Sequence, residues 1–188
     1  MKLMELVKAM ELRPLHNLDR EGQLSILAIR NQPAVRLNMY TSHLISEDEH
    51  ARWVDRLAAD TSVQFFAVMF RDEIIGGASL YAISAQNQRA DWAYYLDETA
   101  QGKGFGAALE FRFLDYVFQH TDTLKLNCEV LGFNEAVISL HKKFGFVEEG
   151  VRREHIRRAE AVHNAHFLGI TKAEWVIRRV ELMRRLFK

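Results

Sequence analysis

Three glycines alternate with other residues in the run Gln101-Gly102-Lys103-Gly104-Phe105-Gly106, between a segment typical of a strand and one typical of a long helix. The first amides of a helix have no partner within it, and the helix dipole adds partial positive charge there. Glycines allow a bulky anion to approach such amides closely. Gln101 can add a side-chain donor and Lys103 a positive charge. The run therefore suits a phosphate-binding loop, although glycine-rich turns of this kind are often only tight turns.

Two other phosphate-binding loops do not fit this run. A dinucleotide fingerprint requires G-x-G-x-x-G spacing inside a parallel strand–helix–strand unit. The glycines here have G-x-G-x-G spacing, and the strand before them belongs to a meander. A nucleotide-hydrolase loop requires Gly-Lys followed by Ser or Thr, whereas Lys103 is followed by Gly104.

Changes of hydrophobic period indicate the elements that position this loop. They predict strands over Met10–His16, Val63–Phe70, Ile74–Ile83, Ala90–Leu96 and Leu124–Leu131, with two more within Val147–Gly169. Caps and amphipathic faces predict helices over Asp19–Arg30, Ser46–Ala59, Gly104–His120, Asn134–Phe144 and Lys172–Phe187. Short connections make the three strands before the loop an antiparallel meander. The pattern is that of a mixed α/β fold.

The composition is that of an ordinary globular chain. Hydrophobic residues make up 48% and charged residues 27%, and the 25 basic residues balance the 25 acidic ones, so net charge favours neither nucleic acid nor a membrane surface. The single cysteine, Cys128, allows no internal disulfide and suits a reducing compartment. No run reaches the ~18 apolar residues of a membrane span, and the N-terminus lacks the apolar run of a signal peptide. We expect a cytoplasmic chain without a nucleic-acid or membrane partner.

Two motifs carry a resemblance to a known family. Gln101-x-x-Gly104-x-Gly106 matches the (Arg/Gln)-x-x-Gly-x-(Gly/Ala) signature of the GNAT family of N-acetyltransferases, and Asn134–Phe146 resembles that family's second motif. The chain is identified as a member of the family from its first strand to about Gly169. The resemblance implies one domain over residues 1–188. Its central sheet would be mixed and mostly antiparallel, with about seven strands, flanked by helices and splayed between the fourth and fifth strands.

The resemblance also implies a site for acetyl-CoA, the expected co-substrate, and no metal. Backbone groups of Tyr95 and Leu96 would meet the pantetheine arm, and Asn134 would hydrogen-bond the arm while capping its helix. Capping alone would also account for Asn134. Lys142 or Lys143 would meet the adenosine 3′-phosphate, and at least one of the two would be an ordinary solvated surface lysine. The residues that would hold the pyrophosphate are Gln101, Gly102, Lys103, Gly104, Phe105 and Gly106.

Two side chains are candidates for proton transfer. His141 stands where the family often has a tyrosine that protonates the departing thiolate, and imidazole, with a pKa of ~6.5 against ~8.5 for a thiol, can do the same. A histidine packed beside Phe144 that only shapes the pocket is the alternative. Glu129 lies on the polar face of its strand and can take the proton of the amine. Pairing with an arginine would also account for Glu129.

The acceptor is suggested by the segment Ile29–Tyr40 and the residues that follow it. This region is similar to a branch of the family that acetylates UDP-linked 4-amino-4,6-dideoxy sugars in pseudaminic acid biosynthesis, which serves flagellin glycosylation. Arg30 and His50 can meet a diphosphate, and aromatic side chains can enclose the uracil ring. Core packing would equally explain Met39 and Trp53. The implied acceptor-site residues are Arg30, Met39, Tyr40, His50, Trp53, Trp92 and Tyr94.

Two other functions remain open. Protein α-amino acetylation of the ribosomal type would require an open, often acidic groove instead of cations and stacking. A non-catalytic CoA-binding module would keep the glycine loop but would need neither Glu129 nor His141. The basic, amphipathic C-terminal helix favours packing or contact within a homodimer over nucleic-acid binding.

Overall fold

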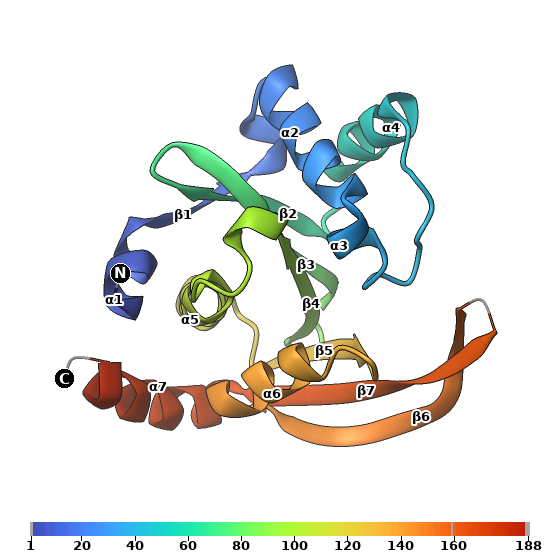
Figure 1. Ribbon diagram of the computed structural model, residues 1–188. Helices are drawn as coiled ribbons and strands as arrows, with labels where there is room; N and C mark the ends of the chain where they lie inside the picture. The colour runs from blue at the N-terminus through green and yellow to red at the C-terminus, as the bar shows by residue number, and fades with distance from the viewer. Residues whose placement is uncertain (1, 159, 187–188) are drawn as a thin grey trace. The chain divides into compact units, whose positions relative to one another are not determined.

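The structure is a computed structural model that describes residues 2–158 and 160–186 (Figure 1). The chain forms two compact units. Unit 1 consists of Met1–Ile83 and Trp92–Leu109, and unit 2 of Ser84–Asp91 and Glu110–Lys188. The prediction of a single domain over residues 1–188 stays a prediction.

The helices and strands follow one another in the mixed order that the sequence predicts. The helices are α1 (Leu3–Ala9), α2 (Arg20–Asn31), α3 (Pro33–Arg36), α4 (Glu47–Leu57), α5 (Phe105–His120), α6 (Glu135–Phe144) and α7 (Lys172–Leu186), with 3-10 turns η1 (Leu15–Asn17) and η2 (Glu98–Ala100). The strands are β1 (Met10–Pro14), β2 (Gln64–Phe70), β3 (Glu73–Ser84), β4 (Arg89–Leu96), β5 (Lys125–Leu131), β6 (Val147–Arg158) and β7 (Ala161–Thr171). They form one sheet in the order β1-β2-β3-β4-β5-β7-β6, mostly antiparallel, which confirms the predicted fold class.

Unit 1 contains the meander and the N-terminal helices. β1 and β3 both pair antiparallel with β2. Asp19 caps α2 by accepting from the Gly22 amide at 2.9 Å, and Ser46 caps α4 by accepting from the Glu49 amide at 3.2 Å. These caps set where each helix begins, so that their apolar faces cover a core cluster that includes Ile26, Val54 and Met69.

Unit 2 contains the parallel strand pair and the C-terminal hairpin. The first residues of β4, Arg89–Asp91, pair parallel with Lys125–Asn127 of β5, and a parallel pair requires a crossover, which α5 supplies. β5 pairs antiparallel with β7, and β7 with the long β6. Asp115 of α5 accepts hydrogen bonds from Trp175 and Arg179 and so fixes α7.

The structure differs from the prediction near the N-terminus. The first strand, predicted over Met10–His16, ends at Pro14 and is followed by η1, and the helices α1 and α3 were not predicted. α1 precedes the first strand, where no element was predicted; it is short, but Leu6 and Val7 are buried, and Glu5 accepts from the Lys2 amide at its start. The C-terminal helix is described as far as Leu186, and residue 187, where it was predicted to end, lies outside the described residues. Within the described ranges, no helix is long and apolar enough to cross a membrane.

Candidate active site

The glycine loop of unit 1 has the backbone that its residues predict. Gly102 and Gly104 have φ angles of +72° and +88°, a region that residues with a Cβ adopt only at a cost. A Cβ at Gly102 would meet nothing within 4 Å, so conformation alone explains that glycine. The loop leads directly into α5 at Phe105, which places the unpartnered first amides of the helix at the end of the loop. The backbone here can bind an anion.

Gln101 and Leu96, both predicted to contact the cofactor, are hydrogen-bonded to each other. Gln101 Nε2 donates to the backbone carbonyl of Leu96 at 3.0 Å, so this side chain shapes the loop. The Tyr95 carbonyl would lie 2.2 Å from a Cβ at Gly76, and only glycine permits that approach. Phe105 packs edge-on against Phe70, with ring centroids 4.8 Å apart. The cofactor roles assigned to these residues stay predictions.

Unit 1 also has a pocket of about 230 Å³, which we call the acceptor pocket. It is built by the end of α2, one face of α4, and strands β2 and β4. Trp53 and Phe65 meet edge to face inside it, with ring centroids 5.0 Å apart. The lining residues are Arg30, Ile45, Glu49, His50, Trp53, Arg56, Phe65 and Tyr95.

The pocket is cationic and its charged groups are partly buried. Arg30 Nη2 donates to the Thr41 carbonyl at 3.0 Å and to its hydroxyl at 3.2 Å, while Arg30 Nη1 is buried and has no hydrogen-bond partner among the described residues. Burial lowers the pKa of Arg30 and raises that of Tyr95, although the charge of each group opposes the shift in the other. The pocket's carboxylate, Glu49, lies 3.1 Å from His43 Nε2.

His50 contributes a neutral ring to the pocket. Its Nε2 lies 2.9 Å from the Gln23 carbonyl and therefore carries the hydrogen. Burial lowers the pKa of His50, and the bond to Gln23 only partly offsets this. A neutral imidazole that donates from Nε2 offers an acceptor at Nδ1, which does not suit a phosphate oxygen. Arg56, which was not predicted from the sequence, also lines the pocket. Its charge suits a phosphate oxygen beside Arg30 better than the neutral ring of His50 does.

The acceptor pocket brings together only some of the predicted residues. Arg30, His50 and Trp53 line it, whereas Met39, Tyr40, Trp92 and Tyr94 do not. Trp92 is 1% exposed and stacks on Tyr94 with ring centroids 5.2 Å apart. Phe65 and the side chain of Tyr95 were missed because strand alternation alone does not distinguish a core-facing ring from one at a pocket.

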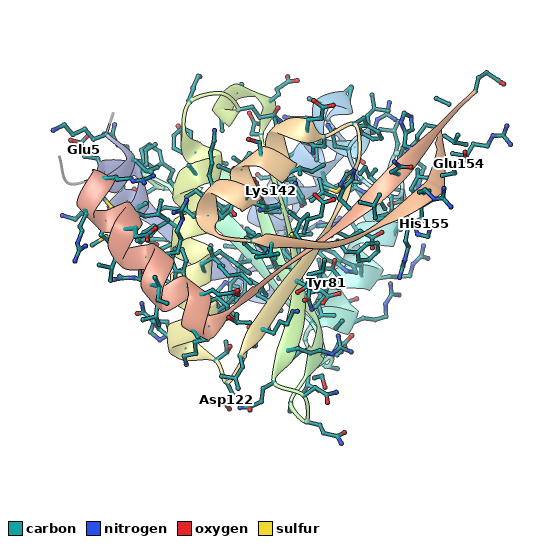
Figure 2. The ribbon with its side chains drawn as sticks, turned by 90° about the horizontal axis from the view of Figure 1, so that it is seen from below. Glu5, Tyr81, Asp122, Lys142, Glu154 and His155 are labelled. Carbon is teal, nitrogen blue, oxygen red and sulfur yellow. The ribbon has the colours of Figure 1, made fainter. Side chains whose placement is uncertain are left out.

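In unit 2, Glu129 lies on β5 at the half-exposed positions that alternate with buried ones. Its Oε1 is 3.9 Å from Nε2 of His155, which lies on β6 (Figure 2). Burial raises the pKa of Glu129, and the charges of Arg152 and His155 oppose the rise. The carboxyl is therefore shifted toward a stronger base, as its predicted role requires.

His141 lies on the buried side of α6. Its Nδ1 is 2.9 Å from Glu110 Oε1, and its ring centroid is 5.1 Å from that of Phe146. Glu110 was not singled out from the sequence. A charged residue in the otherwise apolar stretch Phe105–Phe111 of a helix is the signal that could have identified it.

The remaining predicted cofactor residues lie on α6. Asn134 stands at the N-cap position, but its side chain makes no capping hydrogen bond, which corrects that part of the prediction. Its backbone carbonyl accepts from the amides of Val137 and Ile138 instead.

Lys143 and Lys142 (Figure 2) line an open cavity of about 590 Å³ in unit 2, where Lys142 pairs with Glu148 at 2.5 Å. Across the described residues, no group of three or more His, Cys, Asp or Glu side chains could hold a metal ion.

The mostly antiparallel sheet with one parallel pair, and the glycine loop that leads into the crossover helix, are consistent with the fold of an N-acetyltransferase, and comparison with known proteins agrees. The Acetyltransferase (GNAT) domain family matches residues 10–147. The chain belongs to this family, and it is an N-acetyltransferase that uses acetyl-CoA as donor.

The individual relatives share about a quarter to a third of their residues with this chain over the aligned parts. The SPbeta prophage-derived uncharacterized N-acetyltransferase YokL of Bacillus subtilis (strain 168) is 29% identical over 141 residues, which cover 73% of this chain and 78% of the relative. The spermidine N(1)-acetyltransferase of Vibrio cholerae is 34% identical over 77 residues, 41% of this chain and 44% of that protein. A crystal structure of spermidine N-acetyltransferase from Vibrio cholerae with CoA and spermine has a TM-score of 0.83 at 24% identity, covering 90% of this chain and 99% of that one. That likeness concerns the fold.

Proposed function

We propose that the chain acetylates the 4-amino group of a UDP-linked 4-amino-4,6-dideoxy sugar, the acceptor expected in pseudaminic acid biosynthesis. The observation that carries the proposal is the acceptor pocket, where Arg30 and Arg56 lie with the rings of Trp53 and Phe65. Cations bind a diphosphate, and rings stack on a base. The volume of about 230 Å³ is below the ~300–1,000 Å³ of sites for whole ligands, so the pocket would hold one part of the nucleotide.

The unpartnered Nη1 of Arg30 supports an anionic ligand. A buried donor without a partner costs free energy, and a charged donor costs more than a neutral one. Nη1 is covered by protein atoms, so a phosphate oxygen would supply the missing acceptor, in a charge-assisted hydrogen bond, once a neighbouring side chain shifts on binding. The contacts of Nη2 with Thr41 already fix the plane of the guanidinium, so little side-chain entropy would be lost on binding.

The surroundings of the proposed base also suit an anionic acceptor. Arg152 and His155 flank Glu129 in unit 2. In the proposed reaction Glu129 removes a proton from the acceptor's ammonium group, directly or through water. The neutral amine then attacks the thioester carbonyl of acetyl-CoA, and the thiolate leaves and is protonated. The products are the acetamide and CoA.

Polyamine acetylation is the rival that the relatives' names suggest. A polycation requires carboxylates around it, because like charges repel. The acceptor pocket instead has two arginines and one carboxylate, and that carboxylate is engaged by His43. The charge of the pocket therefore favours an anionic acceptor over spermidine.

The test is release of CoA thiol from acetyl-CoA with one acceptor offered at a time. The acceptors are the UDP-linked 4-amino sugar, spermidine, and a peptide with the N-terminus of a ribosomal protein. We expect turnover with the UDP-sugar. Turnover with spermidine or the peptide alone would reject the acceptor and leave the family assignment intact.

A further inference from the structure

The interior of unit 2 contains three titratable side chains from three different elements. Glu110 lies on α5, Cys128 on β5 and His141 on α6, and they are 0%, 4% and 2% exposed. His141 Nδ1 lies 2.9 Å from Glu110 Oε1, and the His141 side chain is also hydrogen-bonded to Cys128. We call these three residues the internal network.

The charges of the internal network depend on one another. Burial lowers the pKa of His141, but the charge of Glu110 and the hydrogen bonds to Cys128 and Glu110 outweigh it and raise the pKa to about 10. An imidazolium has two N–H donors. Nδ1–H donates to Glu110, which leaves Nε2–H for the sulfur of Cys128. Burial raises the pKa of Cys128, so the thiol stays protonated, and Asp91 is a further charge that acts on it.

The buried carboxylate of Glu110 depends on His141 as its hydrogen-bond partner. Its Oε2 is buried and has no hydrogen-bond partner among the described residues. A buried carboxylate is tolerated when it is paired, and removal of one partner leaves an uncompensated charge. Burial raises the pKa of Glu110, and the charge of His141 and its hydrogen bond oppose the rise, so the bond to His141 favours the charged carboxylate.

The position of His141 on α6 gives the pair a mechanical consequence. His141 lies seven residues after Asn134, about two helical turns or ~10 Å along α6. Because His141 is bonded to both α5 and β5, it fixes α6 in rotation and in translation along its axis. The start of α6, where the proposed arm-binding residue Asn134 lies, is fixed with it.

We propose that His141 is a positioning residue that, through Glu110 and Cys128, holds α6 in the orientation needed to bind acetyl-CoA. The inference rests on the proposed role of α6 in cofactor binding and is independent of the acceptor. It replaces the other interpretation of His141, as the acid that protonates the thiolate, because both ring N–H groups already have partners within unit 2.

The first test is the Kd for acetyl-CoA, measured by calorimetry without any acceptor. We expect Glu110→Gln and His141→Gln each to weaken binding about tenfold, because each leaves one buried partner alone. The double variant removes both charges and should return to within about threefold of the wild type. Glu149→Gln, which breaks the exposed pair between Glu149 of β6 and Lys125 of β5, is the control and should leave the Kd unchanged.

Two outcomes of this titration contradict the proposal. One is an unchanged Kd in both single variants. The other is a double variant as weak as the product of the two single effects, because independent sites add. With any acceptor that the thiol-release assay identifies, a ~10²–10⁴-fold fall in kcat for His141→Gln at constant Kd would restore the role of an acid.

A second measurement uses the wild-type protein and so does not depend on a variant that folds. Nitrogen NMR of ¹⁵N-histidine-labelled protein distinguishes doubly from singly protonated rings among the eight histidines. We expect one ring to remain doubly protonated at pH ~8.5, because Glu110 and Cys128 raise the pKa of His141 to about 10. If every ring has lost its second proton at that pH, the ion pair does not exist and the proposal fails.

Discussion

Arg30 is the residue on which the proposed acceptor depends most. It is fixed by Thr41 through one nitrogen and presents another, buried, without a hydrogen-bond partner among the described residues. A buried donor without a partner requires an explanation, and the anionic acceptor that we propose is one that explains it.

Substitution of Arg30 should therefore change acceptor binding selectively. Arg30→Gln should raise the KM for the UDP-sugar ~10–100-fold, since hydrogen bonds to charged groups contribute ~1.5–3 kcal/mol. The KM for acetyl-CoA should not change in steady-state kinetics. Thr41→Ala isolates the structural contact, and an equal loss in that variant would mean that Arg30 only anchors the loop. Arg20→Gln, at an exposed pair with Glu47 on the same helix, is the control.

Glu129 leads to a prediction about pH. Burial raises the pKa of Glu129 above its ordinary 4.5, although Arg152 and His155 oppose this. A base works only when deprotonated, so kcat/KM should rise with pH through a value above 4.5. Glu129→Gln should lower kcat ~10²–10⁴-fold and abolish this limb of the profile. Its Tm should not fall, because a carboxyl whose pKa rises on folding destabilises the fold at higher pH. An unchanged pH profile would exclude Glu129 as the base.

For single residues, the sequence predicted backbone conformation and exposure better than it predicted which residues contact one another. The positive φ angles of Gly102 and Gly104 and the half-exposed face of Glu129 agree with what their residue types suggested. The place of Arg56 in the pocket and the pairing of Glu110 with His141 could not be predicted, because both depend on residues distant in the chain. A pair such as Glu110 and His141, 31 positions apart, is recognisable only after folding.

Among the elements, α7 is an amphipathic helix of which several apolar side chains remain exposed. A few polar contacts fix it to α5. Asp115 of α5 accepts from Trp175 Nε1 at 3.0 Å and from Arg179 Nε and Nη2 at 2.6 and 2.9 Å. The Trp175 ring lies edge-on to Phe111, with centroids 5.4 Å apart. One carboxylate thus joins two successive turns of α7 to α5.

Removal of this carboxylate should destabilise unit 2. Asp115→Asn should lower the free energy of unfolding by ~1–3 kcal/mol in urea titrations, because the partly buried Arg179 loses a charge-assisted bidentate bond. Glu181→Gln, which breaks the more exposed pair with Arg178, should cost less than ~0.5 kcal/mol. Equal effects of the two substitutions would mean that Asp115 does not anchor α7.

Element type was predictable wherever caps or alternation were strong, as at Asp19, Ser46 and β5. The hairpin β6–β7 was only placed within a range because most of β6 is exposed and its register with β7 shifts twice, which removes the regular alternation. Helix α1 was missed because a helix of seven residues without a Ser, Thr, Asp or Asn cap has a weak signal.

For the whole molecule, the open question is whether the two units unfold together. The family resemblance predicts one domain, and a single domain under ~150–200 residues usually unfolds in one transition. Calorimetry should show one peak, and saturating acetyl-CoA should move all of it. At 100 times its Kd a ligand adds ~2.7 kcal/mol, or about 5–11 °C in Tm for a chain of this size. Two peaks, of which only one moves, would contradict the prediction of a single domain.

The central claim is that this N-acetyltransferase selects an anionic acceptor. A competition reaction tests it most directly, because two acceptors at equal concentration with limiting acetyl-CoA form products in the ratio of their kcat/KM values. The UDP-linked 4-amino sugar and spermidine are the two acceptors, and mass spectrometry quantifies the acetylated products. We predict at least ~100-fold more acetylated sugar, equivalent to ~2.7 kcal/mol of discrimination. An excess of acetylated spermidine would contradict the claim.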